Sequence, residues 1–368
     1  MLRQGRFIIF GLFVILIISG LLTPFSYNHI NVKLLLELVF LCIVFLSLRK
    51  LKKQLLGYLI IAAFYLIYSY ILAYTHKITD FIMIYKTFFY LVMLSLVLGR
   101  RVFDYSFIKY LFYIFIGALL FKYIYSLSFQ FAHRPGLLIE NNFELMFLLL
   151  LFLAKRSFER RVFYLDYVLL FMIVLLSGSR SAILCMLPLL LCERFGENLA
   201  YKSIKYIGLV FAFILVLLVI FFRMEGMSIE DVDRVKFLIV FLQEIEGWSF
   251  WNYLFGNPPI TALSNANCSV LNYYEELFSD TNTNLCYSVV LHSHILRIIL
   301  DHGILGLLFI YLYLYRILRL SMLNKKIIYP TLLILLINSL SVSSLNSIFA
   351  MFGLLILVNL KQDNIPEK

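Results

Sequence analysis

The sequence predicts an all-α protein that crosses a membrane many times. Of its 368 residues, 62% are hydrophobic and only 14% are charged, whereas about a quarter of the residues in a typical soluble domain are charged. The hydrophobic residues gather in long runs that are separated by short basic segments. Because a helix needs about 20 largely apolar residues to span a bilayer, these runs predict membrane helices, and no soluble fold accounts for them.

We expect twelve membrane spans. The first apolar run is followed by Thr23 and Pro24 and not by a small-residue cleavage site, so it predicts a first membrane helix and not a cleaved signal peptide. Residues 289–300 predict a further apolar helix, partly inserted just before the tenth span. The expected spans are 7–22, 32–48, 55–74, 81–98, 107–130, 137–154, 162–178, 180–193, 206–222, 303–320, 327–343 and 347–360.

The basic residues favour an orientation with both termini in the cytoplasm. With the N-terminus inside, the inside connections contain 22 of the 32 Lys and Arg residues and the outside connections contain 8. Cytoplasmic connections of membrane proteins carry such an excess. Lys86 and Lys122 fall well inside spans and count on neither side, and Asp166 is a third ionisable residue within a span. The net charge of +11 therefore reflects topology and does not indicate a nucleic-acid partner.

One outside connection is much longer than the others. Residues 1–368 are expected to form a single transmembrane domain, in which residues 223–290 form a large periplasmic loop of 68 residues between the ninth and tenth spans. Long loops are functional or disordered, and the Trp, Tyr and Leu content of this one argues against disorder. Cys268 and Cys286 lie in it. In an oxidising compartment they form a disulfide or, less usually, stay as two unpaired thiols.

Sequence signatures of metal and nucleotide sites are absent. The chain contains no C-x-x-C pair, no H-E-x-x-H and no Walker loop. We therefore expect neither a metal nor a cofactor. The residues that remain as candidates for chemistry are polar and charged groups at the outer face.

A histidine-rich segment lies at the outer mouth of the tenth span. On the expected helix, His292 shares one face with Leu296 and Ile299, and Gly303 permits a break in the helix. A histidine at such a mouth can act as a general base near neutral pH. The alternative is an interfacial histidine with no chemical role.

Two arginines also lie at the outer ends of spans. Arg180 falls in the Ser- and Gly-rich segment 175–184, and Arg234 lies in an amphipathic stretch of residues 231–245. Each has two interpretations. It is a surface arginine near a turn that reaches for lipid headgroups, or it is a phosphate clamp, because arginine offers a planar fork of donors. The segment 133–144 adds Arg134, Glu140, Asn141, Asn142 and Glu144 to the same side.

Taken in order, these segments resemble the motifs of the bacterial O-antigen polymerase and O-antigen ligase superfamily, which are multi-span enzymes with a large periplasmic loop. The resemblance covers roughly residues 130–310, and Ser293 stands where the family usually has Asn. The matching residues are Arg134, Asn141 and Asn142; Ser177, Gly178, Ser179 and Arg180; Arg234, Phe255, Gly256 and Asn257; and His292, Leu296, Gly303 and Gly306.

The resemblance implies a metal-independent glycosyltransferase of the bacterial inner membrane with its active site facing the periplasm. Such an enzyme polymerises undecaprenyl-diphosphate-linked oligosaccharide repeat units into the O-antigen of lipopolysaccharide or into a capsule polysaccharide. His292 would be the base, and Arg180 and Arg234 would stabilise the diphosphate. His292 is favoured over His294 because the Leu and Gly spacing is counted from it. The residues implied in substrate binding are Arg134, Asn142, Arg297 and His294.

Other functions remain open. The same residues would serve a ligase that transfers the finished glycan to lipid A core. A flippase that transports the same lipid-linked oligosaccharides belongs to a different class, as does a structural or receptor role without chemistry. Transporters usually place functional polar residues near the bilayer midplane, whereas most of the polar residues here lie at the outer face. Membrane lipids, a chain-length regulator and a flippase are the expected partners of a polymerase.

Overall fold

The computed structural model describes residues 2–23, 31–46, 48, 51–129, 135–159, 163–192, 210, 233–279 and 285–361. Within these ranges the regular structure is helical, apart from an isolated bridge between Phe103 and Leu360. The helices of the apolar body are α1 (Leu2–Leu22), α2 (Val32–Leu46), η1 (Lys53–Leu55), α3 (Leu56–Leu72), α4 (Ile78–Val97), α5 (Tyr105–Ser128), α6 (Asn141–Arg156), α7 (Tyr164–Leu176), α8 (Arg180–Cys192), α13 (His294–Leu320), α14 (Lys325–Ser339), η5 (Ser344–Asn346) and α15 (Ile348–Val358).

Four helical segments of the described chain are long and apolar enough to cross a membrane: Lys53–Leu72, Ile78–Val97, Tyr105–Ser128 and His294–Leu320. Several shorter apolar helices accompany them, among them Ile348–Val358. These helices are compatible with the predicted all-α membrane protein. The predicted count of twelve spans and the orientation stay predictions, and the ninth expected span, 206–222, lies outside the described residues apart from position 210.

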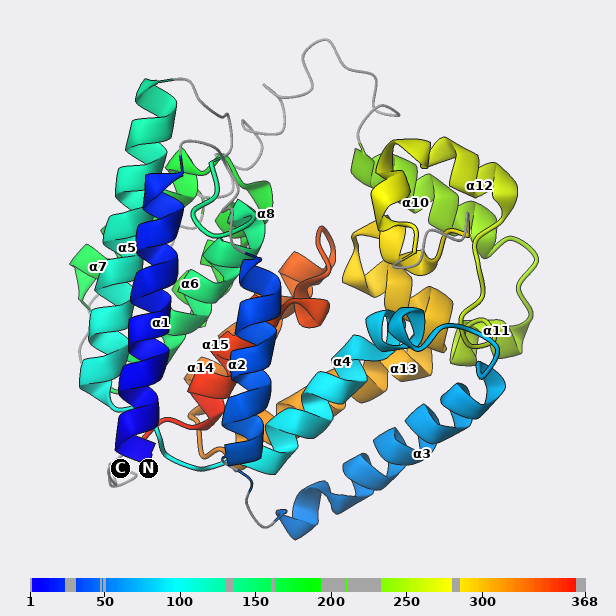
Figure 1. Cartoon of the computed structure of the whole chain (residues 1–368), viewed down its shortest axis with the longest axis horizontal. Helices are drawn as coiled ribbons and strands as arrows, with labels where there is room; N and C mark the ends of the chain where they lie inside the picture. The colour runs from blue at the N-terminus through cyan, green and yellow to red at the C-terminus, as the bar shows by residue number, and fades with distance from the viewer. Residues whose placement is uncertain are drawn as a thin grey trace.

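Two buried helices lie at the centre of the body. Every residue of α15 is buried, and so is almost every residue of α6. Helices that are apolar all round belong inside a protein and not at its surface. Gly353 explains how closely the two helices approach, because a Cβ atom at this position would lie 2.5 Å from the Leu150 side chain. Helices α2, α5, α8 and α14 pack against this pair, whereas α3 lies apart from it (Figure 1).

The two ends of the body differ in what they contain. The chain termini lie at one end, which is the lower end in Figure 1. The connections from α7 to α8 and from α14 to α15 lie at the opposite end. There the first half of α8 contacts the last turn of α14, through Cys185 and Asn338. We call this opposite end, with the N-terminus of α13, the site end.

The described part of the long loop is folded, as its composition predicted. It contains α10 (Asp233–Glu244), α11 (Phe250–Phe255), α12 (Asn265–Val270), η3 (Asn272–Leu277) and η4 (Ser288–Leu291). These elements enclose a second apolar cluster that includes Phe237, Phe241, Leu271 and Leu291. A disulfide joins Cys268 and Cys286, whose Cα atoms are 6.0 Å apart.

The structure corrects the expected helix at 289–300. The 3-10 turn η4 ends at Leu291, and α13 begins at His294 and continues to Leu320 with a kink at Gly303. His292 lies between the two with a positive φ of 48°. Ser293 caps α13 by accepting a hydrogen bond from the Leu296 amide, so the helix cannot start earlier. The predicted break at Gly303 is confirmed, since its φ is 65°.

Candidate functional site

The Asn pair at the start of α6 is bonded to the turn between α7 and α8. Asn142 Oδ1 accepts a hydrogen bond from Ser179 Oγ at 2.7 Å, and Asn141 Nδ2 donates to the Ser177 carbonyl at 3.1 Å. Asn142 also donates through Nδ2 to Glu140 Oε1 at 2.9 Å. Two segments that lie almost 40 residues apart in the sequence are thereby joined into one buried polar cluster.

Arg180 is the first residue of α8 and directly follows Ser179 of this cluster. Its side chain is half-buried, and its buried Nε has no hydrogen-bond partner in the described part of the chain. The N-terminus of a helix carries a partial positive charge and unpaired amides. Arg180 therefore adds a guanidinium to a position that already favours an anion.

His292 lies in a half-buried niche formed by two aromatic rings of the long loop. Its ring centroid is 5.4 Å from that of Phe237 in α10 and 5.5 Å from that of Tyr274 in η3. The expectation that His292 lies on a helical face with Leu296 and Ile299 is wrong, because Ser293 caps α13 and His292 precedes it. The residue is instead held by its backbone, since its carbonyl accepts from Ser343 Oγ at 2.9 Å.

Burial lowers the pKa of His292, so that the ring is mainly neutral at neutral pH. Glu140 and Asp233 counteract this effect, whereas Arg297 and Lys33 add to it. A neutral imidazole can accept a proton. The effect of Glu140 also shows that His292 lies within electrostatic range of the Asn pair and its surroundings.

Arg297 and His294 lie behind the niche, inside the protein. Arg297 is only 3% exposed, and its Nη1 donates to Ser343 Oγ at 2.8 Å. Ser343 thus connects the Arg297 guanidinium to the His292 backbone. His294 is fully buried, with Nε2 3.0 Å from Thr87 Oγ1. Both residues hold the site together from within and do not face solvent.

Two further segments with predicted site residues come from the long loop. Arg234 lies in the first turn of α10, one turn before Phe237, and so on the same side of that helix. The Phe255–Asn257 segment docks on the kink of α13, where the Asn257 amide donates to the Leu300 carbonyl at 2.7 Å. Arg134 lies outside the described residues.

The structure therefore forms two neighbouring groups. One group contains Asn142 and Arg180, and the other contains His292 and Arg297. Glu140 connects them, because it accepts a hydrogen bond from Asn142 and its charge raises the pKa of His292. No described contact joins Arg180 directly to His292. Sequence reasoning missed Ser343, although the serine-rich segment 339–347 was a signal that this turn makes polar contacts.

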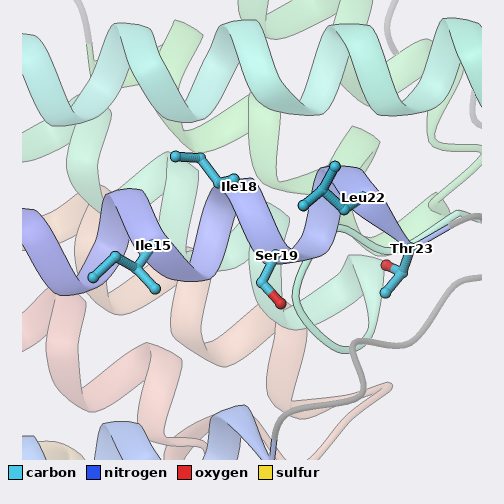
Figure 2. Close-up of a pocket in the computed structure, with 5 residues that line it drawn as sticks. All are labelled: Ile15, Ile18, Ser19, Leu22 and Thr23. Atoms are coloured by element: carbon cyan, nitrogen blue, oxygen red, sulfur yellow. The ribbon is translucent and has the colours of Figure 1, made fainter.

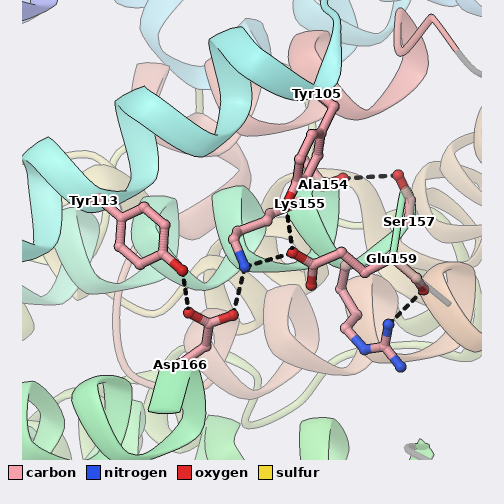
Figure 3. Close-up of polar contacts among 8 residues, drawn as sticks. Tyr105, Tyr113, Ala154, Lys155, Ser157, Glu159 and Asp166 are labelled. Carbon is pink, nitrogen blue, oxygen red and sulfur yellow. Dashed lines mark hydrogen bonds and ion pairs between the residues drawn. The ribbon is translucent and has the colours of Figure 1, made fainter. Parts of the chain in front are cut away.

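Ionisable side chains within the predicted spans have structural partners. Lys86 forms an ion pair with Glu37, and Lys122 donates to the carbonyls of Gly20 and Thr23. Asp166 belongs to a buried cluster around Lys155 (Figure 3). Each of these three side chains, which were the candidates for a transport function, is thus bonded to another part of the protein.

Two further features of the described residues bear on ligands. No group of three or more His, Cys, Asp or Glu side chains there could hold a metal ion. An open apolar depression of about 400 Å³ lies along α1, lined by Ile15, Ile18, Ser19, Leu22 and Thr23 (Figure 2). It contains none of the predicted site residues.

In comparisons with known proteins, no family model and no curated protein sequence matches the chain.

Proposed function

We propose that the chain is a membrane glycosyltransferase that polymerises undecaprenyl-diphosphate-linked oligosaccharides at the periplasmic face of a bacterial inner membrane. One observation carries the proposal: an unpaired arginine Nε at a helix N-terminus and a half-buried neutral histidine lie in neighbouring polar groups at the same end of the body. Such a reaction needs a cationic group for the diphosphate and a base for the attacking hydroxyl.

Arg180 is the group that we assign to the diphosphate. The donor is a sugar whose anomeric carbon is bonded to a lipid diphosphate. When this bond breaks, the electron pair stays on the diphosphate oxygen, and the new negative charge needs fixed positive groups around it. The unpartnered Nε of Arg180 and the N-terminus of α8 supply them. Arg234 is the second arginine that we assign to this role.

His292 is the group that we assign to the acceptor. A hydroxyl of the second glycan forms the new bond to the anomeric carbon, and its proton passes to the neutral imidazole. Phe237 and Tyr274 fix the ring from the loop side, while Ser343 fixes the backbone from the other side. Arg297 is a positioning residue in this scheme, because it contacts Ser343 and is buried.

Ser293 is compatible with this assignment. It caps α13 through its side-chain oxygen, and Asn and Ser are both strongly favoured at that position. Exchanging one for the other preserves the start of the helix and the backbone of His292. The departure from the Asn of the resembling family is therefore conservative in physical terms.

The test is a gel of surface polysaccharide from a strain that lacks the protein and is complemented with His292→Ala. His76→Ala serves as the matched control, because His76 lies in the connection between α3 and α4 and is not one of the proposed site residues. A polymerase that uses His292 loses its long-chain ladder and keeps single repeat units, while His76→Ala keeps the ladder. Both proteins must be present in membranes at wild-type level by blot.

Two other outcomes would contradict the proposal. Loss of every capped product, single repeats included, would indicate a ligase. An unchanged ladder with His292→Ala would remove His292 from the chemistry and favour transport or a non-catalytic role.

A further inference from the structure

Helix α11 of the long loop carries a set of exposed aromatic side chains. Phe250 is 69% exposed, Trp251 66% and Phe255 56%. Their rings contact one another, with centroids 5.7 Å apart for Phe250 and Trp251 and 6.2 Å apart for Trp251 and Phe255. Trp248, by contrast, turns inward and packs against the second apolar cluster. An exposed aromatic patch of this kind marks a surface that another apolar phase covers.

Two glycines fix α11 to the kink of α13. A Cβ atom on Gly256 would lie 2.6 Å from the His302 amide nitrogen, and one on Gly303 would overlap the Leu254 carbonyl. Both residues also have positive φ angles, of 82° and 65°. Such close backbone contact leaves α11 little freedom to move away from α13.

A contact between α3 and α13 shows which part of α3 lies beside the kink. Tyr65 of α3 bonds His302 through its hydroxyl, at 2.8 Å from Nδ1. Leu72, the last residue of α3, lies seven residues further on, which is about 10 Å along a helix axis. The kink and the docked α11 are therefore near the outer end of a membrane span, and Figure 1 draws α11 beside that end of α3.

Exposed tyrosines surround that end of α3. Tyr68 and Tyr70 of α3 and Tyr74 just after it are all exposed, and the other outward residues of α3 are largely apolar. Trp and Tyr are enriched where a membrane span meets the lipid headgroups, because their rings are apolar and their polar atoms reach water. The exposed tyrosines at this end of α3 and the aromatic residues of α11 thus lie near the same end of a membrane span.

We propose that the aromatic face of α11, formed by Phe250, Trp251 and Phe255, inserts into the headgroup region of the bilayer that holds the protein. The occupant of this face is phospholipid. The exposed tyrosines at the neighbouring end of α3 favour this occupant, and an interfacial helix with such a face lies about 5–10 Å into the boundary between headgroups and acyl chains. The contact fixes the α11 segment of the long loop to the membrane surface. This proposal does not depend on the proposed reaction.

The chain has only two Trp residues, which makes the contact measurable. Full-length protein is reconstituted into phosphatidylcholine vesicles whose acyl chains are brominated either near the headgroup or near the chain terminus. Bromine quenches only a nearby indole. For the wild type we expect lipids brominated near the headgroup to remove roughly half of the emission, from one interfacial indole of the two. Lipids brominated near the terminus should remove less.

Trp251→Phe and Trp248→Phe are the matched variants. Trp251→Phe should lose most of the quenching, whereas Trp248→Phe should become more strongly quenched than the wild type. Equal quenching of wild type and Trp251→Phe would overturn the proposal. So would a Trp251 that aqueous iodide quenches and brominated lipid does not, or one shielded from both, which would indicate a protein partner or a second copy. The wild-type and Trp251→Phe comparison leaves the inward Trp248 in place, so it stands even if Trp248→Phe fails to fold.

Discussion

The two ends of the helical body hold their charges in opposite ways. At the end near the termini, Lys155 Nζ lies 2.6 Å from Glu159 Oε1 and 2.5 Å from Asp166 Oδ2. Tyr113 and Tyr105 donate their hydroxyls to the same two carboxylates (Figure 3). At the site end, Arg180 and Arg297 form no ion pair with the described residues, and each has a buried Nε without a partner.

The difference indicates which charges are structural. Buried ions are tolerated when hydrogen bonds and an opposite charge compensate for lost hydration, and the Lys155 cluster meets that condition within the protein. The arginines of the site end have no carboxylate within ion-pair distance among the described residues. Arg297 is enclosed by the protein, whereas Arg180 is half-buried. An anionic ligand would complete the environment of Arg180, which is why we propose the site end and not the Lys155 cluster for binding a diphosphate.

Breaking the paired cluster should have the largest effect on stability. Lys155→Met leaves two buried carboxylates without their cation, which typically lowers the free energy of unfolding by about 3–5 kcal/mol. Thermal unfolding of the purified protein in detergent measures the loss. Lys109→Met on the exposed face of α5 is the control and should change stability by no more than about 0.5 kcal/mol. If Lys155→Met and Lys109→Met unfold at the same temperature, the cluster is not structural.

Removing an unpaired charge should affect activity and leave stability nearly unchanged. Arg180→Ala takes away a donor aimed at the developing negative charge, a change that typically lowers rate by about 100- to 1000-fold. Formation of polymer by reconstituted protein measures it, with Arg319→Ala at the opposite end as control. Arg180→Lys should recover only part of the rate, because an ammonium lacks the planar fork. Wild-type polymer from Arg180→Ala would contradict the comparison between the two ends.

The smallest effect expected is a shift in pH dependence. His292 must be neutral to accept a proton, and burial holds its pKa below the ordinary 6.5. The rate should therefore be constant around pH 7 and fall only as the pH drops through a value below 6.5. Glu140 raises this pKa, so Glu140→Gln should move the fall to lower pH. A fall centred above pH 6.5, or one that Glu140→Gln does not move, would exclude this role of His292.

Much of the fold follows from hydropathy alone. The expected spans 55–74 and 81–98 correspond to α3 and α4 within two or three residues, because long apolar runs have no stable alternative to a helix in a membrane. The start of α6 was less predictable. It begins at Asn141 and not at 137, since the amides of Leu137, Leu138 and Ile139 all bond the Glu144 carboxylate.

The candidate site was predictable in composition but not in geometry. Motif order predicted Asn142, Arg180 and His292 on one outer face, which stays a prediction. The structure joins Asn142 to the turn that precedes Arg180. The conformation of His292 could not be predicted, because its positive φ is stabilised by a bond from Ser343, 51 residues away. Nor does sequence show that His294 and Arg297 lie inward, which depends on how α13 packs against α4 and α14.

The most direct test of the central claim is a reaction with purified components. Wild-type protein, His292→Ala and His76→Ala are reconstituted into vesicles with an undecaprenyl-diphosphate-linked oligosaccharide, and both glycan length and free lipid diphosphate are measured. We expect wild type and His76→Ala to release one lipid diphosphate for each new glycosidic bond, and His292→Ala to be slower by about 100- to 10,000-fold. Equal rates for His292→Ala and wild type, or no lengthened glycan from wild-type protein, would contradict the account.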